Sequence, residues 1–376
     1  MIPSEKITFA VIAGGGTSGH VVPALAIAEL LGEAGHSRDS IHLVGSDRGA
    51  EVQLFANSGY EYTLYRISGL QRSLKPRQLA RTAAMVPRIF VATRSAKGLL
   101  RRLRPRVVVS VGGYASIPAV RAARSLNIPI VTCSYDRRPG LATMVQSLSA
   151  TVSAVAYLPS GLRRAKLTGA PVRASLRRLD RTARRETARR NLQIPHDRQL
   201  VVVMGGSLGS AVLNSALEGA LQMWSLREDL AVLHITGARY LNESTPTLPQ
   251  DSAVWYKRVA YCENMTDVYA AADLVVARSG ASTVAEIATV GIAAILVPWK
   301  DAAKNHQYTN ALWLTSQGGA VMLSETDLNS ESLRAAVDAL LHYPETLLAV
   351  SAQARKLGEV HRNCSIATVI EDAARR

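Results

Sequence analysis

Cysteine is scarce in this sequence, and so are aromatic residues. The 376-residue chain has three cysteines, Cys133, Cys262 and Cys364, and 5% of its residues are aromatic. The cysteines lie far apart and form no C-x-x-C pair, the spacing that many zinc and redox sites use. We therefore predict no metal site, and the cysteine content is typical of a protein from a reducing compartment.

An N-terminal export signal and a long apolar run are also missing. Residues 1–16 read MIPSEKITFAVIAGGG, where a strand-like apolar run replaces the charged region, helical apolar region and cleavage site of a signal peptide. Positions 139–162 carry no charge, but hydroxyl residues, Gln146 and Pro159 make them too polar for a membrane-spanning helix. We expect no secretion, and contact with a membrane only from outside the bilayer.

Acidic residues are in deficit. The chain has 29 aspartates and glutamates against 44 lysines and arginines, which gives a formal net charge of +15. Such an excess predicts a polyanionic ligand or surface at some stage of the protein's work. Nucleic acid, anionic lipid and nucleotide-diphosphate compounds are all compatible with it.

The deficit is sharpest at positions 62–110, which hold 12 lysines and arginines and no acid. Apolar residues lie among these cations: Leu79, Met85, Val86, Ile89, Phe90 and Val91. One interpretation is a solvated helical face beside an ordinary core contact. The other is an interfacial helix whose cations meet anionic lipid at about 1 kcal/mol each. Nucleic-acid binding is less favoured, because interleaved aromatic residues and a known binding module are missing.

Short β-branched runs alternate with helical segments along most of the chain. This alternation is typical of a parallel sheet with helices on both faces. It stops in a basic, strand-poor stretch after Arg173 and restarts at Leu200. We therefore predict an α/β protein with two domains, residues 1–173 and 174–357, and a C-terminal helix at about 358–376 that packs back on the first domain.

Each predicted domain opens with a strand, a glycine turn and a helix. The first turn runs from Gly14 to Gly19 and the second from Gly205 to Gly209. Glycines let the backbone approach a ligand, and the amides that begin the next helix attract anionic oxygens. Two such turns, on lobes that face each other across a cleft, predict a diphosphate ligand. A tight turn without a ligand is the alternative for either one.

The first turn also fits the G-x-G-x-x-G pattern of NAD-binding proteins, with Gly14, Gly16 and Gly19. That pattern expects an acid about 20 residues further on, at the end of the second strand. The acid at that place is Asp47, which lies 28 residues after Gly19. An NAD-dependent dehydrogenase is therefore the weaker interpretation.

His20 follows the first turn directly. An imidazole there is suited to bind phosphate, to act as a general base or simply to cap the turn.

The segment from Asp273 to Trp299 carries a second candidate. We predict a strand at 273–277, a small-residue turn at 279–282 and a helix at 283–290 with Glu286 in its first turn. This carboxylate either compensates the helix dipole or accepts hydrogen bonds from both hydroxyls of a ribose. The run Asn305, His306 and Gln307 follows the next strand on a predicted loop, where its side chains suit sugar hydroxyls.

Taken together, these motifs resemble the MurG family of UDP-N-acetylglucosamine transferases, which convert lipid I to lipid II in bacterial peptidoglycan synthesis. Gly15–His20 is similar to the family's GGTGGH, with Ser18 in place of a glycine, and Gly205–Ser210 is similar to GGSxGA. Arg278–Glu286 matches R-S-G-A-x-T-x-x-E, and Asn305–Ala311 matches N-H-Q-x-x-N-A. Further likenesses are ISGL at 67–70, VGGYAS at 111–116 and G-x-P-V-R at 169–173.

The resemblance implies a GT-B fold and an inverting, metal-independent transfer of GlcNAc to the C4 hydroxyl of a lipid-linked muramyl sugar. It implies that Glu286 binds the ribose, that Arg173 and the backbone at Cys262 flank the uracil, and that Gln307, with His306, holds the GlcNAc. Nucleotide phosphates are then expected at Ser207 and at the amides of Ala281, Ser282 and Thr283. The reacting sugar and the acceptor diphosphate are expected at Thr17, Ser18, Gly19 and His20.

One stretch departs from the family pattern. Where the family reads H-E-Q-N, this chain has Cys133, Ser134, Tyr135 and Asp136. Asp136 stands at the asparagine that touches GlcNAc, and its carboxylate still accepts from a hydroxyl. The family glutamate is missing, which leaves His20 and Asp136 as the ionisable candidates for the base.

The resulting prediction is a peripheral glycosyltransferase on the cytoplasmic face of the bacterial membrane. Its partners would be UDP-GlcNAc, a polyprenyl-diphosphate-linked muramyl-peptide, an anionic membrane surface and possible cell-wall synthesis proteins, with no nucleic acid and no cofactor. Pre-formed amide donors would stabilise the departing UDP without a metal ion, and the sequence has no D-x-D pair. Two alternatives stay open: a related transferase with another lipid or natural-product acceptor, and a catalytically silent scaffold.

Overall fold

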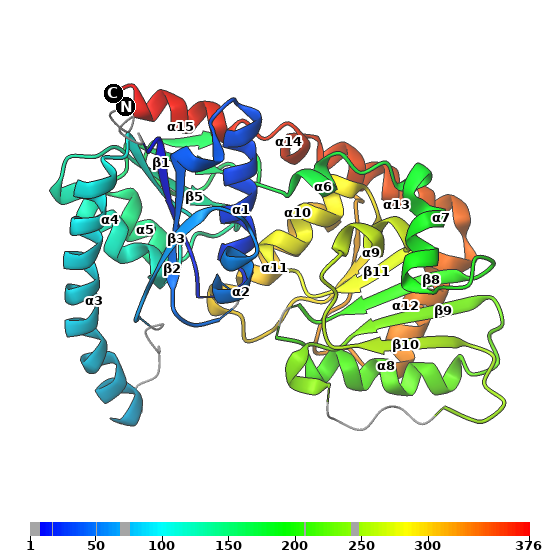
Figure 1. The fold of residues 1–376 in the computed structure, drawn as a ribbon. Helices are drawn as coiled ribbons and strands as arrows, with labels where there is room; N and C mark the ends of the chain where they lie inside the picture. Colours follow the sequence, from blue (N-terminus) through cyan, green and yellow to red (C-terminus); the bar gives the residue numbers. More distant parts are fainter. Residues whose placement is uncertain (1–7, 17, 50, 68–75, 207, 242–247) are drawn as a thin grey trace. The chain divides into compact units, whose positions relative to one another are not determined.

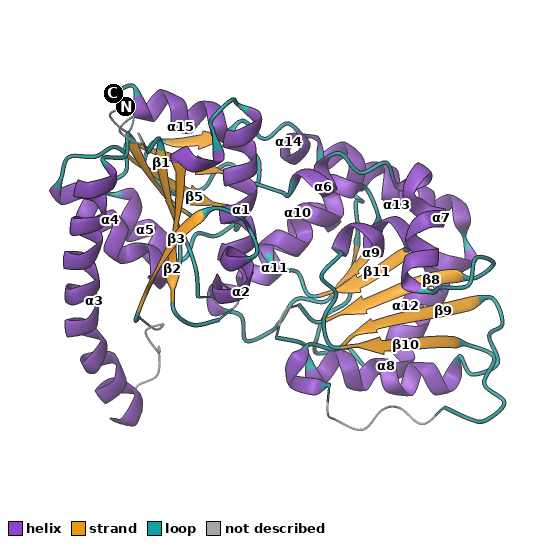
Figure 2. Ribbon diagram, in the orientation of Figure 1, coloured by secondary structure: helices purple, strands orange, loops and turns teal. Residues whose placement is uncertain are grey.

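The computed structural model describes residues 8–16, 18–49, 51–67, 76–206, 208–241 and 248–376, without the side chains of Ser18 and of 76–86. The chain divides into two compact units. The first unit takes the chain up to Ala174 together with Asn363–Arg376, and the second unit takes Ser175–Arg362. Each unit has its own sheet with helices packed on it (Figure 2).

The sheet of the first unit is wholly parallel and has the order β3-β2-β1-β4-β5-β6-β7. Its strands are β1 (Ala10–Ala13), β2 (Ile41–Ser46), β3 (Glu61–Tyr65), β4 (Val107–Ser110), β5 (Ile130–Ser134), β6 (Val152–Val155) and β7 (Ala165–Leu167). Its helices are α1 (Ser18–Glu33), α2 (Glu51–Ala56), α3 (Pro76–Leu103), α4 (Ile117–Ser125), α5 (Leu141–Ser147) and α15 (Ile366–Ala374), with short 3-10 turns η1 (Arg38–Ser40) and η2 (Tyr114–Ser116). The central strands β1, β4 and β5 are buried throughout and mostly apolar, as expected where helices cover both faces of a sheet.

The C-terminal segment packs on the first unit. The amide of Ser365, just before α15, donates to the carbonyl of Thr168 at 3.0 Å, and Glu371 on α15 contacts His36 Nε2 at 3.0 Å. Figure 1 shows α15, in red, beside α1. The structural boundary at Asn363 falls inside the helical segment predicted for 358–376, because α14 (Glu359–Arg362) belongs to the second unit.

Helix α3 packs against α4 (Figure 1). Phe90 and Val91 are 67% and 66% exposed, and Arg88, Arg94 and the pair Arg101 and Arg102 are exposed with them. Leu79, Met85 and Val86 of the predicted mixed face lie outside the residues whose side chains are described. Among the described helices, none is long and apolar enough to cross a membrane.

The second unit repeats the parallel architecture with the order β10-β9-β8-β11-β12-β13. Its strands are β8 (Gln199–Met204), β9 (Leu230–Ile235), β10 (Trp255–Val259), β11 (Leu274–Ala277), β12 (Ala293–Leu296) and β13 (Val321–Met322). Its helices are α7 (Arg181–Leu192), α8 (Ala211–Met223), α9 (Met265–Ala271), α10 (Ala281–Val290), α11 (His306–Thr315), α12 (Ser330–His342), α13 (Pro344–Leu357) and α14. Short turns η3 (Ala238–Tyr240) and η4 (Ala303–Asn305) complete it, and α6 (Ala174–Arg177) lies at the junction in the sequence. The predicted α/β class with two Rossmann-like domains is therefore confirmed.

Several arginines of the basic stretch after Arg173 form ion pairs within the second unit. Helix α7 packs on α9, and its arginines reach the carboxylates around that helix. Arg184 binds Asp267 at 2.8 Å, while Arg185 and the buried Arg189 bind the two oxygens of Asp273 at 2.7 and 3.0 Å. These cations stabilise α7 in place rather than forming a surface for a polyanion.

Candidate functional site

The first glycine turn lies between the side chains of Glu51 and Tyr114. It follows β1, and α1 begins at Ser18. A Cβ at Gly15 would lie 2.6 Å from Oε1 of Glu51, and a Cβ at Gly16, where φ is +97°, would lie 2.5 Å from the ring of Tyr114. Because a side chain would collide with these neighbours, both positions require glycine. Thr17 and the side chain of Ser18 lie outside the described residues, and their roles stay predictions.

A fully buried carboxylate lies behind this turn. Glu51, the first residue of α2, has no exposed surface. Its Oε1 accepts from the amide of Gly16 at 2.7 Å and from the hydroxyl and amide of Ser46 at 2.5 and 3.3 Å. Sequence reasoning missed Glu51 because it looked for an acid at the end of β2, where Asp47 lies beside Arg48 and Arg66 at the surface.

His20 lies on the first turn of α1 and packs against the turn that follows β4. A Cβ at Gly112 or Gly113 would lie 3.4 Å from its ring. Burial lowers the pKa of His20 below its ordinary value, while the negative charges of Asp136 and Glu51 oppose that shift. The imidazole is therefore neutral at pH 7, which is the form that accepts a proton. Asp136, the other candidate for the base, is near enough for its charge to act on the imidazole.

Tyr135 gives the departure from the family pattern a structural role. Its buried hydroxyl donates to the carbonyl of Gly19 at 2.5 Å and to that of Val111 at 3.3 Å. Burial raises the pKa of Tyr135 well above 10, so the hydroxyl stays a donor. The backbone just before His20 is thereby fixed from the side of β5.

The second glycine turn has a buried cation behind it. Ser210 is the N-cap of α8, and its hydroxyl accepts from Nη2 and Nε of Arg278 at 2.7 and 3.2 Å. Arg278 also donates to Glu325 at 2.9 Å, and both side chains are less than 10% exposed. Burial would raise the pKa of Glu325, but hydrogen bonds from Arg278 and the amide of Lys300 lower it overall. Ser207 lies outside the described residues.

Helix α10 begins two residues earlier than the sequence predicted. It covers Ala281–Val290 with Gly280 as its N-cap, so Glu286 lies in the second turn and not the first. Gly280 offers no side chain to cap the amides of Ala281, Ser282 and Thr283, and no other described side chain caps them; an uncapped helix N-terminus is suited to an anion. The hydroxyl of Ser282 is buried and has no hydrogen-bond partner among the described residues.

A tyrosine that sequence reasoning missed holds Glu286. The hydroxyl of Tyr269, on α9, donates to Oε2 of Glu286 at 2.9 Å. Tyr269 is fully buried, and burial, with the nearby charge of Glu286, raises its pKa well above 10. One carboxylate oxygen is thus anchored, which orients the other.

The polar run after β12 lies on a helix and not on the predicted loop. Asn305 ends η4, and His306 and Gln307 begin α11. The amide of Trp299 donates to Oε1 of Gln307 at 3.0 Å, and Nδ1 of His306 lies 2.9 Å from the carbonyl of Ala303. The helix therefore fixes the orientation of both side chains.

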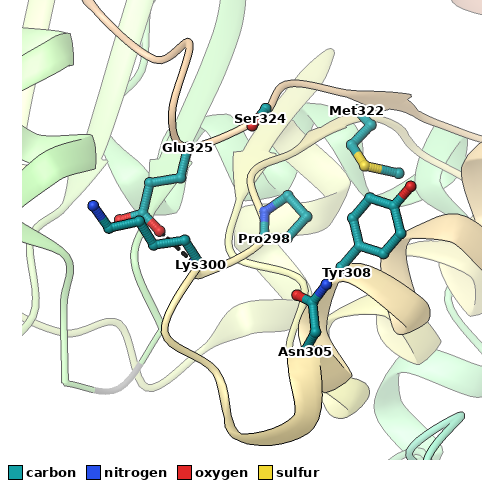
Figure 3. A pocket seen from close by; sticks show the side chains of 7 residues that line it. All are labelled: Pro298, Lys300, Asn305, Tyr308, Met322, Ser324 and Glu325. Carbon is teal, nitrogen blue, oxygen red and sulfur yellow. Dashed lines mark hydrogen bonds between the residues drawn. The ribbon is translucent and has the colours of Figure 1, made fainter.

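A pocket opens at the carboxyl ends of β12 and β13 (Figure 3). The residues that line it are Pro298, Lys300, Asn305, Tyr308, Met322, Ser324 and Glu325. Figure 3 shows the hydrogen bond from the Lys300 amide to Glu325, which is 2.6 Å long. Of the predicted polar run, Asn305 lines this pocket.

The two residues predicted to flank a uracil belong to different units. Arg173 lies in the first unit, where its Nε donates to Glu29 at 2.6 Å. Cys262 lies in the second unit, half-buried after β10. Their joint role at one base stays a prediction.

Comparisons with known proteins match both units. The N-terminal domain model of glycosyltransferase family 28 matches residues 10–156, and the C-terminal domain model of that family matches residues 200–363.

Individual relatives cover almost the whole chain. A protein of Desulforudis audaxviator named UDP-N-acetylglucosamine--N-acetylmuramyl-(pentapeptide) pyrophosphoryl-undecaprenol N-acetylglucosamine transferase is 35% identical over 378 residues, which covers 97% of this chain and 98% of the relative. The protein of the same name from Mycobacterium tuberculosis is 37% identical over 372 residues, with 96% and 88% covered. The crystal structure of MurG from Acinetobacter baumannii matches with a TM-score of 0.72 and 25% identity, and covers 97% of this chain and 99% of that one.

Proposed function

The chain belongs to the MurG family of UDP-N-acetylglucosamine--N-acetylmuramyl-(pentapeptide) pyrophosphoryl-undecaprenol N-acetylglucosamine transferases, and from this premise we propose the reaction that it catalyses. It transfers GlcNAc from UDP-GlcNAc to the C4 hydroxyl of the muramyl sugar of lipid I and so forms lipid II. The observation that carries the proposal is the uncapped N-terminus of α10 with Glu286 anchored one turn further on.

The second unit holds the donor. The amides of Ala281, Ser282 and Thr283 bind the nucleotide phosphates, and Glu286 accepts from the ribose hydroxyls with the oxygen that Tyr269 does not hold. Because the Oε1 of Gln307 is bonded to the Trp299 amide, the NH₂ end of that side chain is the one that meets a GlcNAc hydroxyl. Fixed donors of this kind stabilise the charge that develops on UDP, so the transfer needs no metal ion.

The first unit supplies the base. As the C4 oxygen of the acceptor attacks C1 of GlcNAc, His20 takes the hydroxyl proton, and the bond from C1 to the UDP oxygen breaks with both electrons leaving on UDP. A single displacement of this kind inverts the configuration at C1. Asp136 stabilises the imidazolium that forms, because its charge favours the protonated form of His20.

A lipid-linked acceptor would account for the exposed apolar and basic side chains of α3. An interfacial helix places apolar groups against lipid and cations against anionic headgroups. The exposed Phe90 and Val91 with Arg88, Arg94 and Arg101 supply both kinds of group on α3. We therefore place the enzyme peripherally at the cytoplasmic face of the membrane, where a polyprenyl-linked substrate is presented.

The test is UDP release by the purified chain in anionic vesicles with lipid I or with a simple glycolipid. The proposed function requires lipid I to be the better acceptor and Glu286→Ala to abolish most of the rate. Glu331→Ala, an exposed acid at the start of α12, is the matched control and should keep the wild-type rate.

A second candidate function, transfer to another acceptor, is favoured by one observation: Cys133, Ser134, Tyr135 and Asp136 stand where the family reads H-E-Q-N. If the glycolipid wins in this assay, that candidate replaces the first. If neither acceptor is turned over, the chain is a silent homologue.

A further inference from the structure

Glu51 is the buried charge that the reaction described above does not use. Its side chain has no exposed surface, and among the residues that the structure describes no arginine or lysine forms an ion pair with it. A buried carboxylate is expensive unless hydrogen bonds satisfy it. Three donors satisfy Oε1, whereas Oε2 has no hydrogen-bond partner among the described residues. A fully buried carboxyl group held through one of its oxygens is therefore a candidate for a role beyond packing.

The carboxylate of Glu51 holds the first glycine turn from one side. It binds the amide of Gly16, and it occupies the space that a side chain at Gly15 would need. The ring of Tyr114 closes the other side of the turn, since it lies where a side chain at Gly16 would be. The amide of Gly16 is therefore already engaged, and it does not serve an incoming phosphate.

The hydroxyl of Tyr135 holds the same segment three residues further on. It donates to the carbonyl of Gly19, and the next residue is His20. The backbone that leads into His20 is thus fixed at an amide by an acid on α2 and at a carbonyl by a tyrosine after β5. A base must be held within a few tenths of an ångström of its target, and such a double attachment supplies that precision.

We propose that Glu51 is a positioning residue for proton removal by His20: it fixes the backbone of the first glycine turn at Gly16, four residues before His20. The inference rests on the proposed function only for its kinetic test. The charged groups that act on His20 are Asp136, from the end of β5, and Glu51, from α2, and both raise its pKa against the effect of burial.

The experiment separates the effect of the negative charge of Glu51 from the effect of the hydrogen bonds that hold the first glycine turn. Glu51→Gln keeps an amide oxygen that accepts from Gly16 but removes the charge. Tyr135→Phe keeps the charge but removes the attachment at Gly19. Glu61→Gln, on the neighbouring strand β3 and 55% exposed, is the matched control.

The kinetic readout is the pH profile of kcat with lipid I. A base must be deprotonated, so the acid limb of the profile follows the pKa of His20. We expect Glu51→Gln to lower kcat about tenfold, which is less than the roughly 10²- to 10⁴-fold that a general base contributes because His20 itself is kept, and to move the acid limb to lower pH. KM for UDP-GlcNAc should stay within about twofold, because the donor residues lie in the other unit. Tyr135→Phe should lower kcat by a smaller factor and leave the acid limb in place, and Glu61→Gln should change neither.

A titration of the His20 ring by NMR makes the test independent of turnover. Its pKa should be lower in Glu51→Gln than in wild type, even if lipid I proves to be the wrong acceptor. An unmoved His20 titration together with an unmoved acid limb would overturn the inference. If Glu51→Gln does not fold, Glu51→Asp decides, because it keeps the acid but shortens its reach to the Gly16 amide: a wild-type kcat in that variant shows that this attachment is not needed, and the inference fails.

Discussion

The two units use the same strand, glycine turn and helix, but place opposite charges behind the turn. In the first unit the buried group is the carboxylate of Glu51, which binds the turn's own amide at Gly16. In the second unit it is the guanidinium of Arg278, which binds the N-cap hydroxyl of Ser210. A buried anion disfavours a phosphate and favours a protonated base, whereas the charge of Arg278 is balanced by Glu325 at 2.9 Å. The same local motif is therefore combined with a buried acid in the first unit and with a buried ion pair in the second.

The units also differ in where they keep their arginines. In the first unit, Arg101 and Arg102 of α3 are exposed. In the second unit, Arg185 and Arg189 of α7 are paired with Asp273. The basic residues are thus divided between exposed arginines on α3 and internal ion pairs on α7, and composition alone does not distinguish the two.

The largest effect is expected from removing the cation behind the second turn. Arg278→Met leaves Glu325 as an uncompensated buried charge, and we expect the free energy of unfolding to fall by about 3 kcal/mol. Urea denaturation measures it. The double variant Arg278→Met with Glu325→Leu should recover part of the loss, since no buried charge remains. Equal stability of the single and double variants would show that the pair is not coupled.

Charge reversal at the C-terminal end of α3 tests whether its exposed arginines bind anionic lipid, in contrast to the paired arginines of α7. Arg101, Arg102 and Arg104 changed together to glutamate should weaken binding to anionic vesicles by on the order of 100-fold, at about 1 kcal/mol for each cation lost. Sedimentation with vesicles measures the affinity. The control is Arg190→Glu on α7, which should bind as wild type does. Unchanged sedimentation of the triple variant would return α3 to an ordinary solvated helix.

Removal of Glu286 tests whether the second unit binds UDP-GlcNAc through the ribose. Glu286→Ala should weaken UDP-GlcNAc binding by about 2 kcal/mol, since hydrogen bonds to a charged group are lost. Calorimetric titration with UDP-GlcNAc measures the affinity. Tyr269→Phe, which removes the hydrogen bond to Oε2 of Glu286 but keeps the carboxylate, should have a smaller effect. A wild-type affinity in Glu286→Ala would remove the ribose assignment.

The smallest effect is expected at Asp136. Asp136→Asn removes one of the two charges that raise the pKa of His20, so the acid limb of the kcat profile should move to lower pH. The shift should add to that of Glu51→Gln in the double variant if both charges act on the same imidazole. A limb that moves to higher pH would exclude His20 as the base.

Much of the fold could be predicted from the sequence. Alternating β-branched runs and helical segments indicate parallel sheets, and both sheets are parallel. The two glycine turns and Glu286 were also found from local patterns. Helix boundaries were less accurate: α10 begins at Ala281 because Gly280 already serves as its N-cap, and the polar run at 305–307 begins a helix where a loop was predicted.

The partners of these residues could not be predicted, because they come from distant positions. Tyr269 reaches Glu286 from another helix, and Arg278 reaches Ser210 across 68 residues. Glu51 gave no local signal, since an acid at the start of a helix is common at protein surfaces. Its meaning depends on burial, which the sequence around it does not show.

By itself the sequence determined the family, the two parallel-sheet units and the places where a strand delivers the chain to a helix through glycine. These features follow from the order of local conformational preferences along the chain. Only the tertiary structure decided which charge lies behind each turn and which cations stay at the surface. Electrostatic effects depend on distance and on exclusion of water, and both are set when remote segments pack together.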